Sequence, residues 1–255
     1  MLSELINLNL FAFLLIFARI GTAFSLMPGF GSQQVPMTAR LVFALLVSLL
    51  VTPILLPIIP TEPAAPSVLV LLLISEVLIG AFLGTIPRIF LGSLQTAGTI
   101  LAMVSSMANS FIQDPISEQQ SAVLSTFIST VAITLVFVTD THHLMLMAVV
   151  DSYNLFVPAE GVQVGDMTDY IAHRVADSFR IGVQISSPLV VSGVAYYLVL
   201  GIMGRLMPQL PVFFFGMPIQ IAMQIWILIL SLSGMMIVFM RYFEGNLYNF
   251  LIPLG

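Results

Sequence analysis

The chain has 255 residues, of which 59% are hydrophobic and 7% charged, and its mean hydropathy is +1.09. Soluble domains carry roughly a quarter of charged residues, so this composition excludes a soluble fold and indicates an integral membrane protein. The net charge of -5 gives a nucleic-acid partner no electrostatic support, and the absence of cysteine excludes disulfides and thiolate metal sites.

Three apolar runs of about 20 residues, the length of a membrane-spanning helix, occupy the first part of the chain: Leu5–Met27, Leu41–Pro60 and Val68–Leu91. Glu4 and Arg19 do not fit a cleavable signal peptide, so we expect the first run to be a retained helix. Prolines in the second run are expected to break or kink its last turns.

The third run carries small residues four positions apart, Gly80 and Gly84, and this spacing continues through Gly98, Ala102 and Ser106. Residues four apart lie on one face of a helix, and small ones let another backbone come close. We therefore expect helices that pack tightly on other helices rather than helices surrounded by lipid.

A polar segment, Ser105–Ser121, interrupts the apolar pattern. Either it is an extramembrane loop between two spans, or it is a re-entrant segment that lines or plugs a pore and is satisfied there by protein or water. Met103 and Met107, at its start, are spaced i, i+4. They either form a flexible seal around a moving substrate or fill the core. The candidate pore residues are Met103, Met107, Asn109, Ser110, Phe111, Gln113, Asp114, Pro115 and Glu118.

The second half of the chain holds two apolar stretches, Val123–Val138 and Leu144–Val157, that form either one bent helix or a hairpin. Asp166–Arg180 has apolar residues every three or four positions after an aspartate N-cap, so we expect an amphipathic helix at an interface or at a partner surface. Long apolar segments follow at Ile181–Met203 and Val212–Met240. The arginines are too sparse to orient these segments by the positive-inside rule.

Four ionisable residues lie in or beside apolar segments: Arg19, Glu76, Asp140 and Asp151. A charge at the middle of a bilayer costs about 2.5–3.5 kcal/mol on insertion scales, so such residues face protein or water. They form a proton or ion path, or else they belong to an internal salt bridge or to a helix end at the headgroups. Under the first alternative, Glu76 and Asp151 are the coupling residues of an ion-coupled small-molecule transporter.

Catalysis and metal binding have little support in these residues. The sequence has no Gly-rich phosphate loop, nucleophile elbow or zinc-binding helix motif, so we expect no enzyme and no cofactor. His142 and His143 are adjacent, and adjacent residues on a helix point about 100° apart, so we expect no shared metal site. A pair of histidines at a helix end is the simpler interpretation.

Three stretches together resemble the FliR family of flagellar export-gate proteins and its injectisome counterparts. The first runs from Ala97 through Asp114-Pro115 to Leu124, and the second, Thr139–Pro158, looks like the family's His-containing turn and closing proline. The third is similar to the family's run of Arg, Pro-Gln, Phe and Gly-x-Pro. Its matching positions are Arg205, Pro208, Gln209, Phe213, Gly216 and Pro218.

The resemblance implies an all-α membrane protein of kinked helical hairpins, with a FliP-like region at residues 1–165 and a FliQ-like hairpin at residues 166–255. It also implies that residues 106–121 form a plug inside a closed channel built with FliP and FliQ, with FlhB around it and FlhA below. Unfolded export substrates pass through such a channel. The implied location is the bacterial inner membrane, in the flagellar basal body.

The leading interpretation is therefore a structural, non-catalytic component of a type III protein export gate. An ion-coupled transporter is the second interpretation, and a membrane scaffold whose polar segment is only a connector is the third. A transporter is complete alone or as a homo-oligomer, whereas an export gate needs heteromeric partners.

Overall fold

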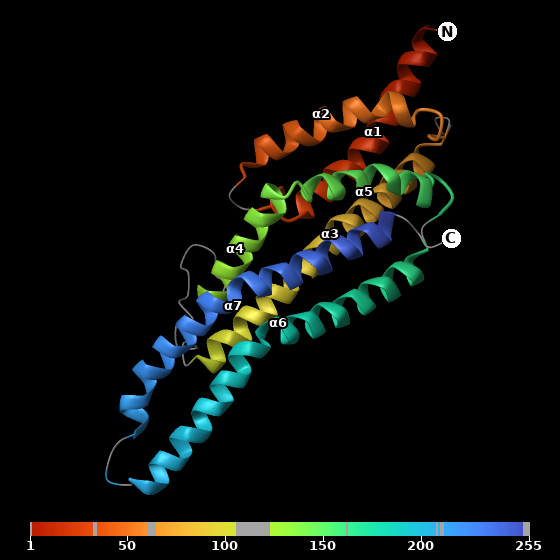
Figure 1. Ribbon diagram of the computed structural model, residues 1–255. Helices are drawn as coiled ribbons and strands as arrows, with labels where there is room; N and C mark the ends of the chain where they lie inside the picture. The colour runs from red at the N-terminus through yellow and green to blue at the C-terminus, as the bar shows by residue number, and fades with distance from the viewer. Residues whose placement is uncertain are drawn as a thin grey trace. The chain divides into compact units, whose positions relative to one another are not determined.

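The computed structural model describes residues 2–32, 35–60, 65–105, 123–161, 163–207, 209 and 212–251. Within those ranges the chain folds into helices without strands (Figure 1), which confirms the expected all-α class. The helices are α1 (Leu2–Leu26), α2 (Met37–Leu55), α3 (Pro66–Val104), α4 (Val123–Val138), α5 (His142–Leu155), α6 (Val164–Leu206) and α7 (Val212–Leu251).

Four of these helices are long and apolar enough to cross a membrane, namely α2, α3, α6 and the Phe215–Tyr248 part of α7. α4 and α5 pass the same test only as a pair, and the chain bends by 73° at the break between them. α1 is a helix as expected, with a shorter apolar stretch at Leu10–Leu26. The chain is therefore a multi-pass membrane protein.

Three helices run further than the sequence predicts. α3 continues past Leu91, α7 continues past Met240, and Asp166–Arg180 is the first part of α6 rather than a separate amphipathic helix. Pro87 and Pro188 lie inside α3 and α6 without ending them. A proline removes one backbone hydrogen bond, but ending a helix in apolar surroundings leaves several more backbone groups unsatisfied.

Contacts divide the chain into two compact units, each assembled from stretches that are separated in sequence. Unit 1 comprises Met1–Ile89, Phe137–Arg174 and Glu244–Gly255, and unit 2 comprises Phe90–Val136 and Val175–Phe243. This division follows contacts within the chain, so it does not test the expected likeness to FliP and FliQ. The FliP-like region at residues 1–165 and the FliQ-like hairpin at residues 166–255 stay predictions.

In unit 1, α1 and α2 lie side by side (Figure 1), and α1 also packs on α3. The buried face of α1 recurs every three or four residues and comprises Phe11, Ala12, Leu15, Ile16, Arg19, Ile20, Ala23 and Phe24. A Cβ on Gly84 would lie 2.6 Å from the carbonyl oxygen of Ala23, and one on Gly80 would collide with the carbonyl of Arg19. The close packing expected from these glycines is confirmed.

In unit 2, α6 and α7 form an antiparallel hairpin. Leu189 of α6 is hydrogen-bonded to Gln224 of α7, and Tyr196, further along α6, is bonded to Gly216, earlier in α7. Partners that move in opposite directions along the two helices define the antiparallel arrangement.

Replacing Gly84 with valine tests the contact between α1 and α3. The new side chain must displace the α1 backbone, and overpacking of this kind costs about 1–3 kcal/mol, so we expect the free energy of unfolding in detergent to fall by that amount. Gly234→Val is the matched control, because a Cβ there meets nothing within 4 Å. Equal losses of stability in the two variants would contradict the packing described here.

Candidate functional site

The predicted pore residues fall mostly in a part of the chain that the structure does not describe, residues 106–122. Met103 is the one member of the set that it does place, in the last turn of α3. Met103 is 59% exposed. Its role in a seal stays a prediction.

The helices on either side of the polar segment pack against each other in unit 2. α3 ends at Val104, and α4 begins at Val123. A Cβ on Gly98 of α3 would collide with the backbone of Ser125 in α4, and the Ser125 hydroxyl donates a hydrogen bond of 3.4 Å to the carbonyl oxygen of Gln95. The polar segment therefore connects two helices that pack directly against each other.

Two buried glutamines of α7, Gln220 and Gln224, hold the end of α3 and the middle of α6. Each is 1% exposed. The Gln220 amide donates a hydrogen bond of 2.7 Å to the carbonyl of Val104, one of the carbonyls that a helix C-terminus leaves without an intrahelical partner. Gln224 donates to the carbonyl of Leu189 at 3.3 Å and accepts from the Ser192 hydroxyl at 3.4 Å. The two residues form a glutamine clasp at the point where the polar segment begins.

The glutamine clasp was not predicted, although the sequence contains its signal. Gln220 and Gln224 stand four positions apart in an otherwise apolar helix, which places both amides on one face. Polar residues inside apolar helices pair with protein groups rather than with lipid. Their partners could not be deduced, because Val104 lies 116 positions away from Gln220.

The third family-like motif spans the connection between α6 and α7. Gly216 is buried and its carbonyl accepts a hydrogen bond of 2.6 Å from the Tyr196 hydroxyl, as a packing position requires. Phe213 is the second residue of α7, and Pro208 lies outside the described residues. The exposed members of the motif are Arg205, Gln209 and Pro218. Contacts within this chain therefore do not bury Arg205.

A fully buried ion pair joins three helices of unit 1. Arg19 of α1 donates from Nε and Nη2 to the two carboxylate oxygens of Glu76 in α3, at 2.6 and 3.0 Å. The remaining donors reach the Ser152 hydroxyl at 3.2 Å and the carbonyl of Phe156 at 2.9 Å. The guanidinium also lies 3.8 Å from the ring centre of Tyr153. Both charges are 0% exposed, so this network replaces the water that each has lost.

This network decides between the two interpretations of the ionisable residues. The internal salt bridge is confirmed, because Arg19 and Glu76 neutralise each other. Asp140 and Asp151 are exposed and take no part in the network. An ion path through Glu76 and Asp151 has no support in this arrangement.

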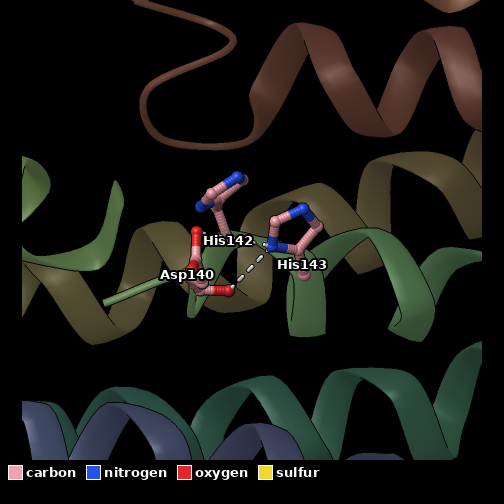
Figure 2. Close-up of side chains that lie close together, drawn as sticks. All are labelled: Asp140, His142 and His143. Atoms are coloured by element: carbon pink, nitrogen blue, oxygen red, sulfur yellow. Dashed lines mark hydrogen bonds and ion pairs between the residues drawn. The ribbon is translucent and has the colours of Figure 1, made fainter. Parts of the chain in front are cut away.

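The turn between α4 and α5 gathers Asp140, His142 and His143 (Figure 2). α5 begins at His142, which confirms the expected helix-end position. The expectation that the two rings point apart is wrong, because their centroids lie 4.1 Å from each other. Both histidines lie in the first turn of α5, so their Cβ atoms point in different directions, but the two rings turn toward each other beyond the Cβ atoms. Asp140, which precedes the helix, has a left-handed φ of 58°.

Most of the sequence, including the residues of the glutamine clasp and of the Arg19 network, matches a known family. A sequence model described as bacterial export proteins, family 1, matches residues 10–245. The chain belongs to this family of bacterial export proteins. The glutamine clasp and the buried Arg19 network are therefore parts of an export protein, and the resemblance read from the sequence motifs is confirmed.

Several relatives of this export protein have the same name. Flagellar biosynthetic protein FliR of Caulobacter vibrioides is 38% identical over 231 residues, which cover 90% of this chain and 92% of that protein. FliR of Bacillus subtilis is 31% identical, over 91% of this chain and 90% of that protein. FliR of Escherichia coli is 26% identical, over 96% and 92%.

Neutralising Arg19 tests the buried ion pair. Removing one partner of a buried pair costs about 3–5 kcal/mol, because the other charge remains without a partner. We expect Arg19→Met to lower the free energy of unfolding in detergent by that amount, and Arg19→Met/Glu76→Met to be more stable than Arg19→Met. The exposed Arg205→Met serves as the control. If the loss of stability in the double variant equals the sum of the losses in Arg19→Met and Glu76→Met, the two charges are not coupled.

Replacing Gln220 with leucine tests the glutamine clasp. The carbonyl of Val104 then loses its partner, and a buried unsatisfied group costs about 1–3 kcal/mol. We expect a loss of this size in the free energy of unfolding, and little change for Gln184→Leu on the exposed side of α6. If the two variants have the same stability, the hydrogen bond to Val104 does not hold the end of α3.

Proposed function

We propose that this chain is a structural subunit of the flagellar export apparatus and that residues 106–121 plug its protein-conducting channel. The match to bacterial export proteins over residues 10–245 carries the first part of the proposal. Caulobacter, Bacillus and Escherichia relatives that are all named flagellar biosynthetic protein FliR point to the flagellar system.

The plug is supported by the helices around the polar segment. α3 and α4 pack closely at Gly98 and Ser125, and Gln220 of the glutamine clasp caps the carbonyl of Val104, the last residue of α3. A segment that closes a pore must open without loosening the wall from which it extends. Anchoring both of its ends on one packed helix pair meets that requirement.

Heteromeric partners are supported by the surface of the chain. Large apolar side chains are exposed on α2, α6 and α7, among them Leu50 at 72%, Leu198 at 65% and Leu230 at 76%. Such faces are covered by lipid or by other subunits. We propose that FliP and FliQ cover part of them in a helical export gate, with FlhB and FlhA as further partners in the bacterial inner membrane.

The transporter alternative gains no support from the family or from the buried charges. Glu76, one of its two coupling residues, is held in the Arg19 ion pair, and Asp151, the other, is exposed. The proposal assigns no catalytic step to this chain. It assigns a passive role: to form the channel wall and to keep the channel closed until an unfolded substrate enters.

Shortening the polar segment tests the proposed plug. We expect deletion of residues 110–118 to raise the passive ion leak across the inner membrane of cells that assemble the complete export complex, because the channel then lacks its closure. Deleting residues 61–64, between α2 and α3, is the control and should leave the leak unchanged. Unchanged leak and unchanged secretion in the first variant would show that the segment is only a connector.

A further inference from the structure

A cluster of metal-ligating side chains lies at the turn between α4 and α5. Asp140, His142 and His143 each offer one ligand atom, and these atoms all lie within 4.8 Å of one another. Figure 2 shows the two imidazole rings next to each other and Asp140 beside them. We propose that these three residues bind a divalent transition-metal ion of the Zn²⁺ class.

The ligand set fits the chemistry of zinc. Two imidazoles and a carboxylate bind Zn²⁺ at about 2.0–2.2 Å, which places tetrahedral ligand atoms about 3.3 Å apart. The Nδ1 atom of His143 lies 3.8 Å from a carboxylate oxygen of Asp140 and is hydrogen-bonded at 3.2 Å to the backbone carbonyl oxygen of the same residue. Coordination through Nδ1 replaces that hydrogen bond. Closing the largest separation requires rotation of side chains, and those of Asp140 and His143 are 78% and 60% exposed, which leaves them room to rotate.

The third ligand is held in place by the surrounding packing. The ring of His142 stacks on Phe137 with centroids 4.9 Å apart, and Phe137 in turn contacts Phe30 at 5.5 Å. The neighbouring Thr141 hydroxyl donates a hydrogen bond of 3.2 Å to Glu244 in α7. The stacking restricts the orientation of the His142 ring, so less conformational freedom is lost when an ion binds.

His142 also has a nitrogen that lacks a partner. Its Nδ1 atom is buried and makes no hydrogen bond within the part of the chain that the structure describes. Buried polar atoms in folded proteins nearly always have a partner. Coordination through this nitrogen supplies one.

The bound ion would link Asp140, which precedes α5, to the first turn of that helix. It would thus stabilise the turn at which the chain bends by 73°, since metal binding is coupled to the folding of the residues that supply the ligands. The proposal does not depend on the plug, because it uses only residues of unit 1.

The test is a titration of the full-length chain with Zn²⁺, using protein purified in detergent through a tag that contains no histidine. We expect one Zn²⁺ per chain, and at least tenfold weaker binding for His143→Ala and for Asp140→Asn. Asparagine tolerates the left-handed backbone at this position, so Asp140→Asn removes the charge without straining the turn. His173→Ala is the control, because it removes the one other histidine of the chain.

A second readout keeps the test independent of folding defects. Zn²⁺ should raise the unfolding temperature of the unmodified chain and of His173→Ala, but not that of His143→Ala or Asp140→Asn. The proposal is overturned if the unmodified chain binds no Zn²⁺ in a one-to-one ratio. It is also overturned if both site variants bind as tightly as the unmodified chain, or if His173→Ala weakens binding as much as they do.

Discussion

The ion pair between Arg19 and Glu76 is the contact on which the packing of unit 1 depends. A charge inside an apolar helix has no water available, so its partners must come from neighbouring helices. Gly80, one turn after Glu76, lets α3 approach the backbone of Arg19, and Ser152 and Phe156 supply the remaining acceptors. Because three parts of the unit meet at one guanidinium, none of them can slide without leaving a buried charge without its partners.

The same requirement is met in unit 2 by neutral groups. The carbonyl at the end of α3 would be left without a partner in apolar surroundings, and Gln220 of α7 provides one. The polar segment begins immediately after this contact. Buried hydrogen bonds and small-residue contacts therefore hold the helices that flank the polar segment. We propose that the segment itself is the displaceable closure of the channel.

Sequence reasoning predicted the membrane class, the existence of the helices and the close approach at Gly80 and Gly84, because hydropathy and small-residue spacing are local signals. It predicted that Arg19 needs a partner but not that the partner is Glu76, which lies 57 positions away. It placed a helix boundary at Arg180, where the charge pattern changes, although α6 continues. The geometry of the histidine pair was misjudged because the spacing of helical positions fixes the direction of Cβ but not the orientation of the imidazole ring beyond it.

The central claim is tested most directly by crosslinking from the polar segment to a substrate that is stalled during export. The chain has no cysteine, so Gln113→Cys introduces the sole thiol of this subunit. The account predicts a crosslink from this thiol to the stalled substrate, and none from Val199→Cys on the exposed surface of α6. It is contradicted if Gln113→Cys forms no crosslink and reacts with a water-soluble thiol reagent equally well with and without substrate.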